Sequence, residues 1–227
     1  MQSPEAFSHP VAGFKLYETH ISWVLLTGPY AYKFKKPLDL GFADYSSLEK
    51  RRTFCEEELR LNRRLAPDLY LDVVAVTGDV QRPRVGGEGE AIEYCVRMAQ
   101  FPDADRLDKV IERGELETAQ IDSIAEQIAR FHRTVLRADP DSRYGTPERI
   151  LERVLANFFE LEEVTELGES RRDRLKELET WSRTRHKELD ETFRQRRRDG
   201  FVRECHGDIH LGNMALWKSR VIIFDAI

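Results

Sequence analysis

The chain has 227 residues, of which 41% are hydrophobic and 34% are charged, and its formal net charge is -5. This length suits one large domain or one domain of two lobes, and the composition is that of a globular protein. The acidic balance predicts no general attraction to nucleic acid or to an anionic membrane, and no apolar run approaches the length that spans a bilayer.

The N-terminus and the cysteines favour a cytoplasmic protein. The first ten residues, MQSPEAFSHP, lack the basic and apolar segments of a secretory signal. Cys55, Cys95 and Cys205 form no Cys-x-x-Cys pair, which indicates reduced thiols. Because nothing else near Cys205 marks a cysteine hydrolase, we interpret it as a buried structural thiol.

The front of the chain is expected to form strands. Three runs rich in aromatic and β-branched residues cover residues 14–17, 21–26 and 30–35, and Gly28-Pro29 separates the last two. A turn dipeptide between two such runs predicts a hairpin. Side chains alternate along a strand, so Lys33 and Lys35 are expected on one face of the third run.

Ser46-Ser47 precede an expected helix that runs to about Leu65 and carries three consecutive glutamates. Glu58 precedes Leu61 by three residues and Leu65 by seven, which favours an inward-facing position. Glu57 is the alternative, and the remaining glutamates would lie on a charged, solvated face.

Strands are expected over residues 69–76 and 91–98, with residues 81–90 as a polar connection between them. Residues 98–102 resemble a hinge, and from residue 103 the pattern is helical. Amphipathic helices are expected around residues 121–135 and 147–159. A charged helix over residues 169–198 would be about 45 Å long if unbroken.

The most informative stretch is ECHGDIHLGNMALWKSRVIIFDAI, residues 204–227. Asp208 lies five residues before Asn213, two short strands follow, and Asp225 ends the second strand. In phosphoryl transfer, an aspartate accepts the proton of the acceptor hydroxyl, and an asparagine and a second aspartate hold magnesium. Those hard oxygen ligands are the ones magnesium prefers.

Two other interpretations of this stretch stay open. Each polar residue taken alone could be an ordinary turn or strand-end residue. His206, Asp208 and His210 of the HGDIH segment could also bind the metal of a hydrolase, although such a site needs further ligands.

HGDIHLGN followed by IIFDAI resembles the aminoglycoside phosphotransferase-like family, whose fold is that of protein kinases. The front segments YAYKFKKP and CEEELRLNRRLAP are similar to a bacterial branch whose members are called phosphotransferase family enzymes. The resemblance implies an α+β, bilobal fold with an antiparallel-sheet N-lobe at 1–98 and a hinge at 99–102. A mainly helical C-lobe would occupy 103–227, and it is expected to be incomplete because the family normally continues with further helices.

Carried over by residue, the resemblance makes Asp208 the catalytic base and His206 the residue that orients the loop. Asn213 and Asp225 would be the metal ligands. On the third front run, YAYK resembles the Val-Ala-Ile-Lys pattern of kinases, so Lys33 would hold the α/β-phosphates, with Lys35 as the alternative.

Three further features are expected around the nucleotide. Glu58, or else Glu57, would pair with the phosphate-binding lysine. No Gly-x-Gly-x-x-Gly loop is present; the segment from Thr19 to Ser22 occupies the corresponding place, where its backbone amides and the hydroxyl of Ser22 or Thr19 are expected to contact phosphate. The backbone near Gln100 would bind adenine.

These implications together predict a small-molecule kinase with ATP and Mg²⁺ as cofactors and a small-molecule hydroxyl as acceptor. No nucleic acid or membrane partner is expected. The alternatives are a nucleotide-binding pseudokinase or regulatory module without turnover, and a metal-dependent hydrolase that uses the HGDIH segment.

Overall fold

The front of the molecule is a six-stranded antiparallel sheet, seen in a computed structural model that describes residues 2–39, 41, 43–164 and 168–227. The strand order is β1-β2-β3-β6-β4-β5. The strands are β1 (Lys15–Glu18), β2 (Ser22–Leu26), β3 (Tyr30–Lys35), β4 (Tyr70–Gly78), β5 (Pro83–Val85) and β6 (Ala91–Ala99). The three expected front strands are therefore present, whereas β5 lies within a segment that we expected to be a plain connection.

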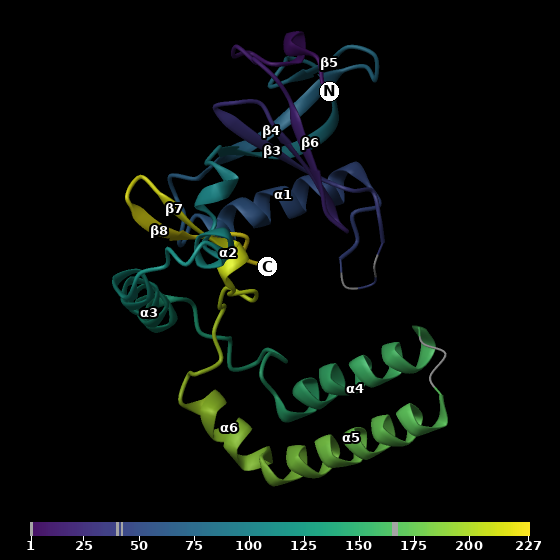
Figure 1. Cartoon of the computed structure of the whole chain (residues 1–227). Helices are drawn as coiled ribbons and strands as arrows, with labels where there is room; N and C mark the ends of the chain where they lie inside the picture. Colours follow the sequence, from purple (N-terminus) through teal and green to yellow (C-terminus); the bar gives the residue numbers. More distant parts are fainter. Residues whose placement is uncertain (1, 40, 42, 165–167) are drawn as a thin grey trace. The chain divides into compact units, whose positions relative to one another are not determined.

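Helix α1 (Leu48–Asn62) lies along one face of this sheet (Figure 1). It begins where the Ser47 side chain accepts a hydrogen bond from the Lys50 backbone N–H, at 3.2 Å, which satisfies one of the free donors of the first turn. Cys55 of α1 is fully buried against Tyr70 and Val96 of the sheet. The helix is thus fixed over strands β4 and β6 by an apolar contact.

The opposite face of the sheet packs under the N-terminal segment, which contains the short 3-10 helix η1 (Pro4–Ala6). Phe7 is buried there with Tyr32 and Phe34 of β3. Because side chains alternate along β3, this arrangement leaves Lys33 and Lys35 on the face toward α1.

A hairpin of β7 (Met214–Trp217) and β8 (Arg220–Ile223) packs into the same core as α1. Its two-residue turn has positive φ at Lys218 and Ser219, 50° and 62°, as a tight hairpin turn of matching twist requires. Ala215 and Ile222 share a buried cluster with Cys55. The hairpin expected from the sequence is therefore present, and its core contacts set its position against the sheet.

Helices dominate the remaining sequence. They are α2 (Leu107–Glu112), α3 (Thr118–Thr134), α4 (Pro147–Val164), α5 (Glu169–Glu188) and α6 (Asp190–Arg198), with the 3-10 helices η2 (Asp103–Asp105) and η3 (Leu211–Asn213). The single long helix considered for residues 169–198 is wrong: it breaks at Leu189, whose ψ is 0°. Asp190 starts α6 and accepts from Arg194, as an acidic residue in a first turn does.

The α+β prediction is confirmed, because a curled antiparallel sheet is followed by helices, as in a kinase-like fold. The structure separates into two compact units, one of Met1–Gln127 with His206–Ile227 and one of Ile128–Cys205. The first unit contains every predicted site residue. The lobe boundaries expected at residues 98 and 103 stay a prediction. No helix in the described ranges is both long and apolar enough to cross a bilayer.

Candidate active site

Two lysines of β3 meet one glutamate of α1. The Lys33 ammonium lies 2.9 Å from Glu58 Oε1, and the Lys35 ammonium bonds Glu58 Oε2. All three residues are at most 9% exposed. Glu57 instead lies at the surface and pairs with Arg60. The geometry therefore selects Glu58 over Glu57, and it engages both candidate lysines at once.

Lys33 also reaches across to Asp225 and bonds its Oδ1. Burial alone would lower the pKa of Lys33, but the carboxylates of Glu58 and Asp225 outweigh that effect and raise the pKa well above the usual lysine value. Lys33 therefore carries a fixed positive charge where the sheet meets the segment that follows β8 and contains Asp225. Among the described residues, Lys35 pairs with Glu58 and not with Asp225, and its ammonium lies over the ring of Tyr45.

His206 is fully buried and fixes the loop that carries Asp208. Its Nδ1 accepts from the Asp208 backbone N–H at 3.3 Å, so its Nε2 must donate to the Phe224 carbonyl, 3.0 Å away. Burial lowers the pKa of His206, which keeps the ring neutral and suits this pattern. His206 thus joins the start of the loop to Phe224, the residue after β8, and its role in orienting the loop stays a prediction.

Asp208 and Asn213 are held together within the loop. The Asn213 side-chain amide donates to the Asp208 carbonyl and to Asp208 Oδ2, both at 3.0 Å. The Asp208 carboxylate remains about half exposed and also lies 3.4 Å from His210 Nε2. Since the Phe224 N–H donates to the Asn213 carbonyl at 2.9 Å, this loop is tied to the residue before Asp225.

The residues present fit a magnesium ion. Because Asn213 donates through Nδ2, its Oδ1 faces away from those bonds, and Asp225 keeps a carboxylate that is 38% exposed. Two protein oxygens suit magnesium, which keeps several waters and takes phosphate oxygens as further ligands. Within the described part of the chain, no three His, Cys, Asp or Glu side chains gather as a metal cage would require.

Ser22 and Gln100 are placed less favourably for their predicted contacts. Ser22 is fully buried opposite Lys35 in the strand register, its Oγ lacks a hydrogen-bond partner among the described residues, and its backbone N–H bonds Thr19 Oγ1. The Gln100 backbone N–H donates to Pro29 O at 3.0 Å, and its side chain accepts from Gly28. Both contacts stay predictions, and both would require a local rearrangement.

Sequence reasoning missed two residues that support this site, Asn62 and Tyr70. Both are 1% exposed, and both bond the backbone next to or at Asp225. A polar Asn four residues after Glu58, on the same helix face, was the available signal. Cys205 was also misjudged, since it is exposed.

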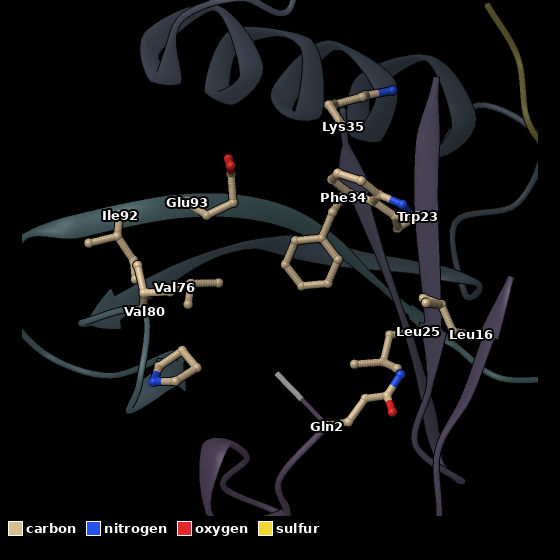
Figure 2. A pocket seen from close by; sticks show the side chains of 11 residues that line it. Gln2, Leu16, Trp23, Leu25, Phe34, Lys35, Val76, Val80, Ile92 and Glu93 are labelled. Carbon is tan, nitrogen blue, oxygen red and sulfur yellow. The ribbon is translucent and has the colours of Figure 1, made fainter. Parts of the chain in front are cut away.

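A pocket of about 490 Å³ lies elsewhere, between the N-terminal segment and the sheet (Figure 2). Its lining is mainly apolar, with Trp23, Leu25 and Phe34 on its walls, while the Lys35 ammonium points away toward the helix. None of Asp208, Asn213 and Asp225 lines it. This pocket is therefore separate from the candidate active site.

An aspartate in a loop, an adjacent amide and carboxylate, and a buried lysine–glutamate pair are the combination of groups that phosphoryl transfer uses. The chain matches the model of the phosphotransferase enzyme family over residues 46–225, and it belongs to that family.

Curated relatives place the same segment within longer proteins. The chain is 32% identical over 157 residues to Uncharacterized protein Mb2027c of Mycobacterium bovis and to Uncharacterized protein Rv2004c of Mycobacterium tuberculosis. In each comparison the match covers 68% of this chain and 30% of the relative. The matched segment thus makes up less than a third of each relative.

Proposed function

We propose that this chain transfers the γ-phosphoryl group of ATP to a hydroxyl group of a small molecule. The observation that carries the proposal is Lys33, whose ammonium meets Glu58 on α1 and Asp225 after β8 at the same time. A buried cation between a helix carboxylate and a potential metal ligand is the arrangement that phosphoryl transfer uses to hold a nucleotide.

In this proposal Lys33 bonds the α/β-phosphates, and Glu58 keeps its ammonium directed toward them. Lys35 neutralises the second oxygen of Glu58. Asn213 and Asp225 would hold magnesium, which when bound neutralises phosphate charge. Most of the rate acceleration in such a site comes from positioning and from electrostatic stabilisation.

Asp208 accepts the proton of the acceptor hydroxyl. The hydroxyl oxygen then bonds the γ-phosphorus while the bond from that phosphorus to the β–γ bridging oxygen breaks, and ADP leaves with the bonding electrons. Asn213 holds the Asp208 carboxylate through its amide, and His206 fixes the backbone of the same loop.

The test is Asp208→Asn, assayed for transfer from ATP across a panel of small alcohols and sugars. We expect transfer to fall by at least about a hundredfold, because general-base catalysis contributes that much, while ATP binding is retained. Asp79→Asn is the matched control, since Asp79 lies in the turn after β4 and only accepts backbone bonds. Equal turnover by Asp208→Asn and the unmodified chain would contradict the assigned role.

The same assay separates the alternatives. Magnesium-dependent ATP binding without transfer to any acceptor would favour a nucleotide-binding module. Stoichiometric zinc in the purified chain would favour a hydrolase, but both ring nitrogens of His206 are already hydrogen-bonded, which leaves that ring no free lone pair for a metal.

A further inference from the structure

Four consecutive backbone N–H groups after β8 are bound by four separate parts of the molecule. They belong to residues 224–227, the segment that contains Asp225. In order, the acceptors are Asn213 O, Tyr70 Oη, Asn62 Oδ1 and His206 O. Only the third of these comes from α1, the helix that also carries Glu58.

Asn62 binds both backbone groups of Ala226. Its Oδ1 accepts from the Ala226 N–H at 2.7 Å, and its Nδ2 donates to the Ala226 carbonyl at 3.3 Å. The same Nδ2 donates to the Glu58 carbonyl at 2.9 Å. Asn62 is 1% exposed and Ala226 is 5% exposed, so water cannot readily replace these bonds.

The side chain at this position must offer a donor and an acceptor together. An asparagine amide does so in the way a peptide group does. An aspartate has no donor when ionised and would place a further negative charge beside Glu58, while an alanine would leave two buried backbone groups unpaired.

Asp225 needs such support because its backbone has φ of +64°. For a residue with a side chain, the left-handed conformation costs roughly 1–2 kcal/mol, so it persists only where the surroundings hold it. Tyr70 binds the N–H of Asp225 itself at 3.2 Å, and Asn62 binds the next residue. In this conformation the Asp225 carboxylate meets Lys33.

We propose that Asn62 is a positioning residue: by pairing with both backbone groups of Ala226, it keeps Asp225 in the left-handed conformation in which its carboxylate can serve as a magnesium ligand. This inference rests on the proposed function, because it concerns the metal ligand of that site. Asn62 acts through Ala226 and Asp225 and touches neither the nucleotide nor the metal.

The experiment measures ATP binding to the full chain by calorimetry, first in EDTA and then over a series of Mg²⁺ concentrations. We expect Asn62→Ala and Asn62→Asp to raise the Mg²⁺ concentration for half-maximal tightening by about tenfold, as the loss of an outer-shell partner does. ATP affinity in EDTA should stay unchanged, because the Lys33–Glu58 pair is retained. A general loss of folding would weaken both.

Cys55→Ala is the matched control. Cys55 lies on the same helix and is fully buried; it shares an apolar cluster with Phe224, but among the described residues its thiol bonds the Tyr94 carbonyl, 3.9 Å away, and no backbone group of residues 224–227. If Cys55→Ala shifts the Mg²⁺ dependence as much as Asn62→Ala does, the effect is one of helix packing and the inference is overturned. An Asn62 variant with the normal Mg²⁺ dependence overturns it as well.

Tyr70→Phe keeps the test decisive if the Asn62 variants fail to fold, since it removes one acceptor of the Asp225 N–H and preserves the ring. A rise in the required Mg²⁺ supports the inference, and an unchanged value overturns it. An unmodified chain that binds ATP with no dependence on Mg²⁺ would overturn the proposed function and the inference with it. If the unmodified chain binds ATP in a Mg²⁺-dependent way, the Mg²⁺ dependence of the Asn62 variants tests the inference alone and leaves the proposed function unchanged.

Discussion

Two ion pairs of nearly equal length lie in very different surroundings. Lys33 Nζ is 2.9 Å from Glu58 Oε1, and Arg183 Nη2 on α5 is 2.7 Å from Glu179 Oε1. The side chains of the first pair are 11% and 5% exposed, and those of the second are 49% and 29% exposed. Since solvent screens the second pair, burial rather than distance decides what each contributes.

Glu58→Gln tests the stability contribution of the buried pair most directly. The change leaves two buried ammonium groups without their shared carboxylate, which costs about 3–5 kcal/mol for a buried pair. We expect a large fall in the urea concentration at the midpoint of unfolding, measured by circular dichroism. A loss below about 1 kcal/mol would mean that the cluster is solvated and resembles an exposed pair.

The pH dependence of the unfolding free energy should also show that the Glu58 pair is buried. Burial opposes ionisation of Glu58, but Lys33 and Lys35 outweigh it and lower its pKa from 4.5 to about 2. A carboxyl whose pKa is depressed on folding contributes stability that is fully present above its unfolded pKa and is lost as pH falls through the folded value. Unfolding free energy should therefore drop by on the order of 3 kcal/mol between pH 4.5 and pH 2.

Other carboxylates also protonate in that range, so the measurement compares two proteins. Glu58→Gln should show a shallower decline with acid than the unmodified chain, because the titrating group is gone. Parallel declines in the two proteins would contradict the depressed pKa of Glu58.

Within the buried cluster, the two lysines should differ in function. Lys33→Met should weaken MgATP binding by roughly tenfold or more, since a charge-assisted bond to phosphate is lost. Lys35→Met should lower stability and leave MgATP affinity nearly unchanged, because Lys35 pairs with Glu58 and lies beside Tyr45. Calorimetric measurement of MgATP affinity for both variants decides which lysine contacts the phosphates. The reverse pattern would assign that contact to Lys35.

The smallest effect is expected on α5. Glu179→Gln removes a pair between partly exposed side chains one helical turn apart, worth about 0.5 kcal/mol or less. The urea midpoint should move little, and less still in high salt. A loss comparable with that of Glu58→Gln would overturn the contrast between the two regions.

Local patterns predicted much of this molecule because they depend on neighbouring residues. The spacing of Asp208 and Asn213, the β7–β8 hairpin and the shared face of Lys33 and Lys35 are all short-range features. The α+β class followed from expected strands at the front of the chain and expected helices after them. The selection of Glu58 over Glu57 needed only the phase of one helix.

Contacts between residues far apart in the sequence could not be predicted. Asn62 and Ala226 are 164 residues apart, and no periodicity links them. The break at Leu189 interrupts a charged pattern that continues on both sides of it, so no periodicity signalled it. The burial of Ser22 and the exposure of Cys205 likewise depend on neighbours brought close by folding.

Glu58 and Asn62 are four residues apart, so they project from the same side of α1. One engages the two lysines of β3, and the other engages Ala226 beside Asp225. A rotation or outward swing of this helix would release both connections together. Both connections therefore depend on the position of this one helix, so a change that displaces α1 should loosen the lysine cluster and the backbone beside Asp225 together.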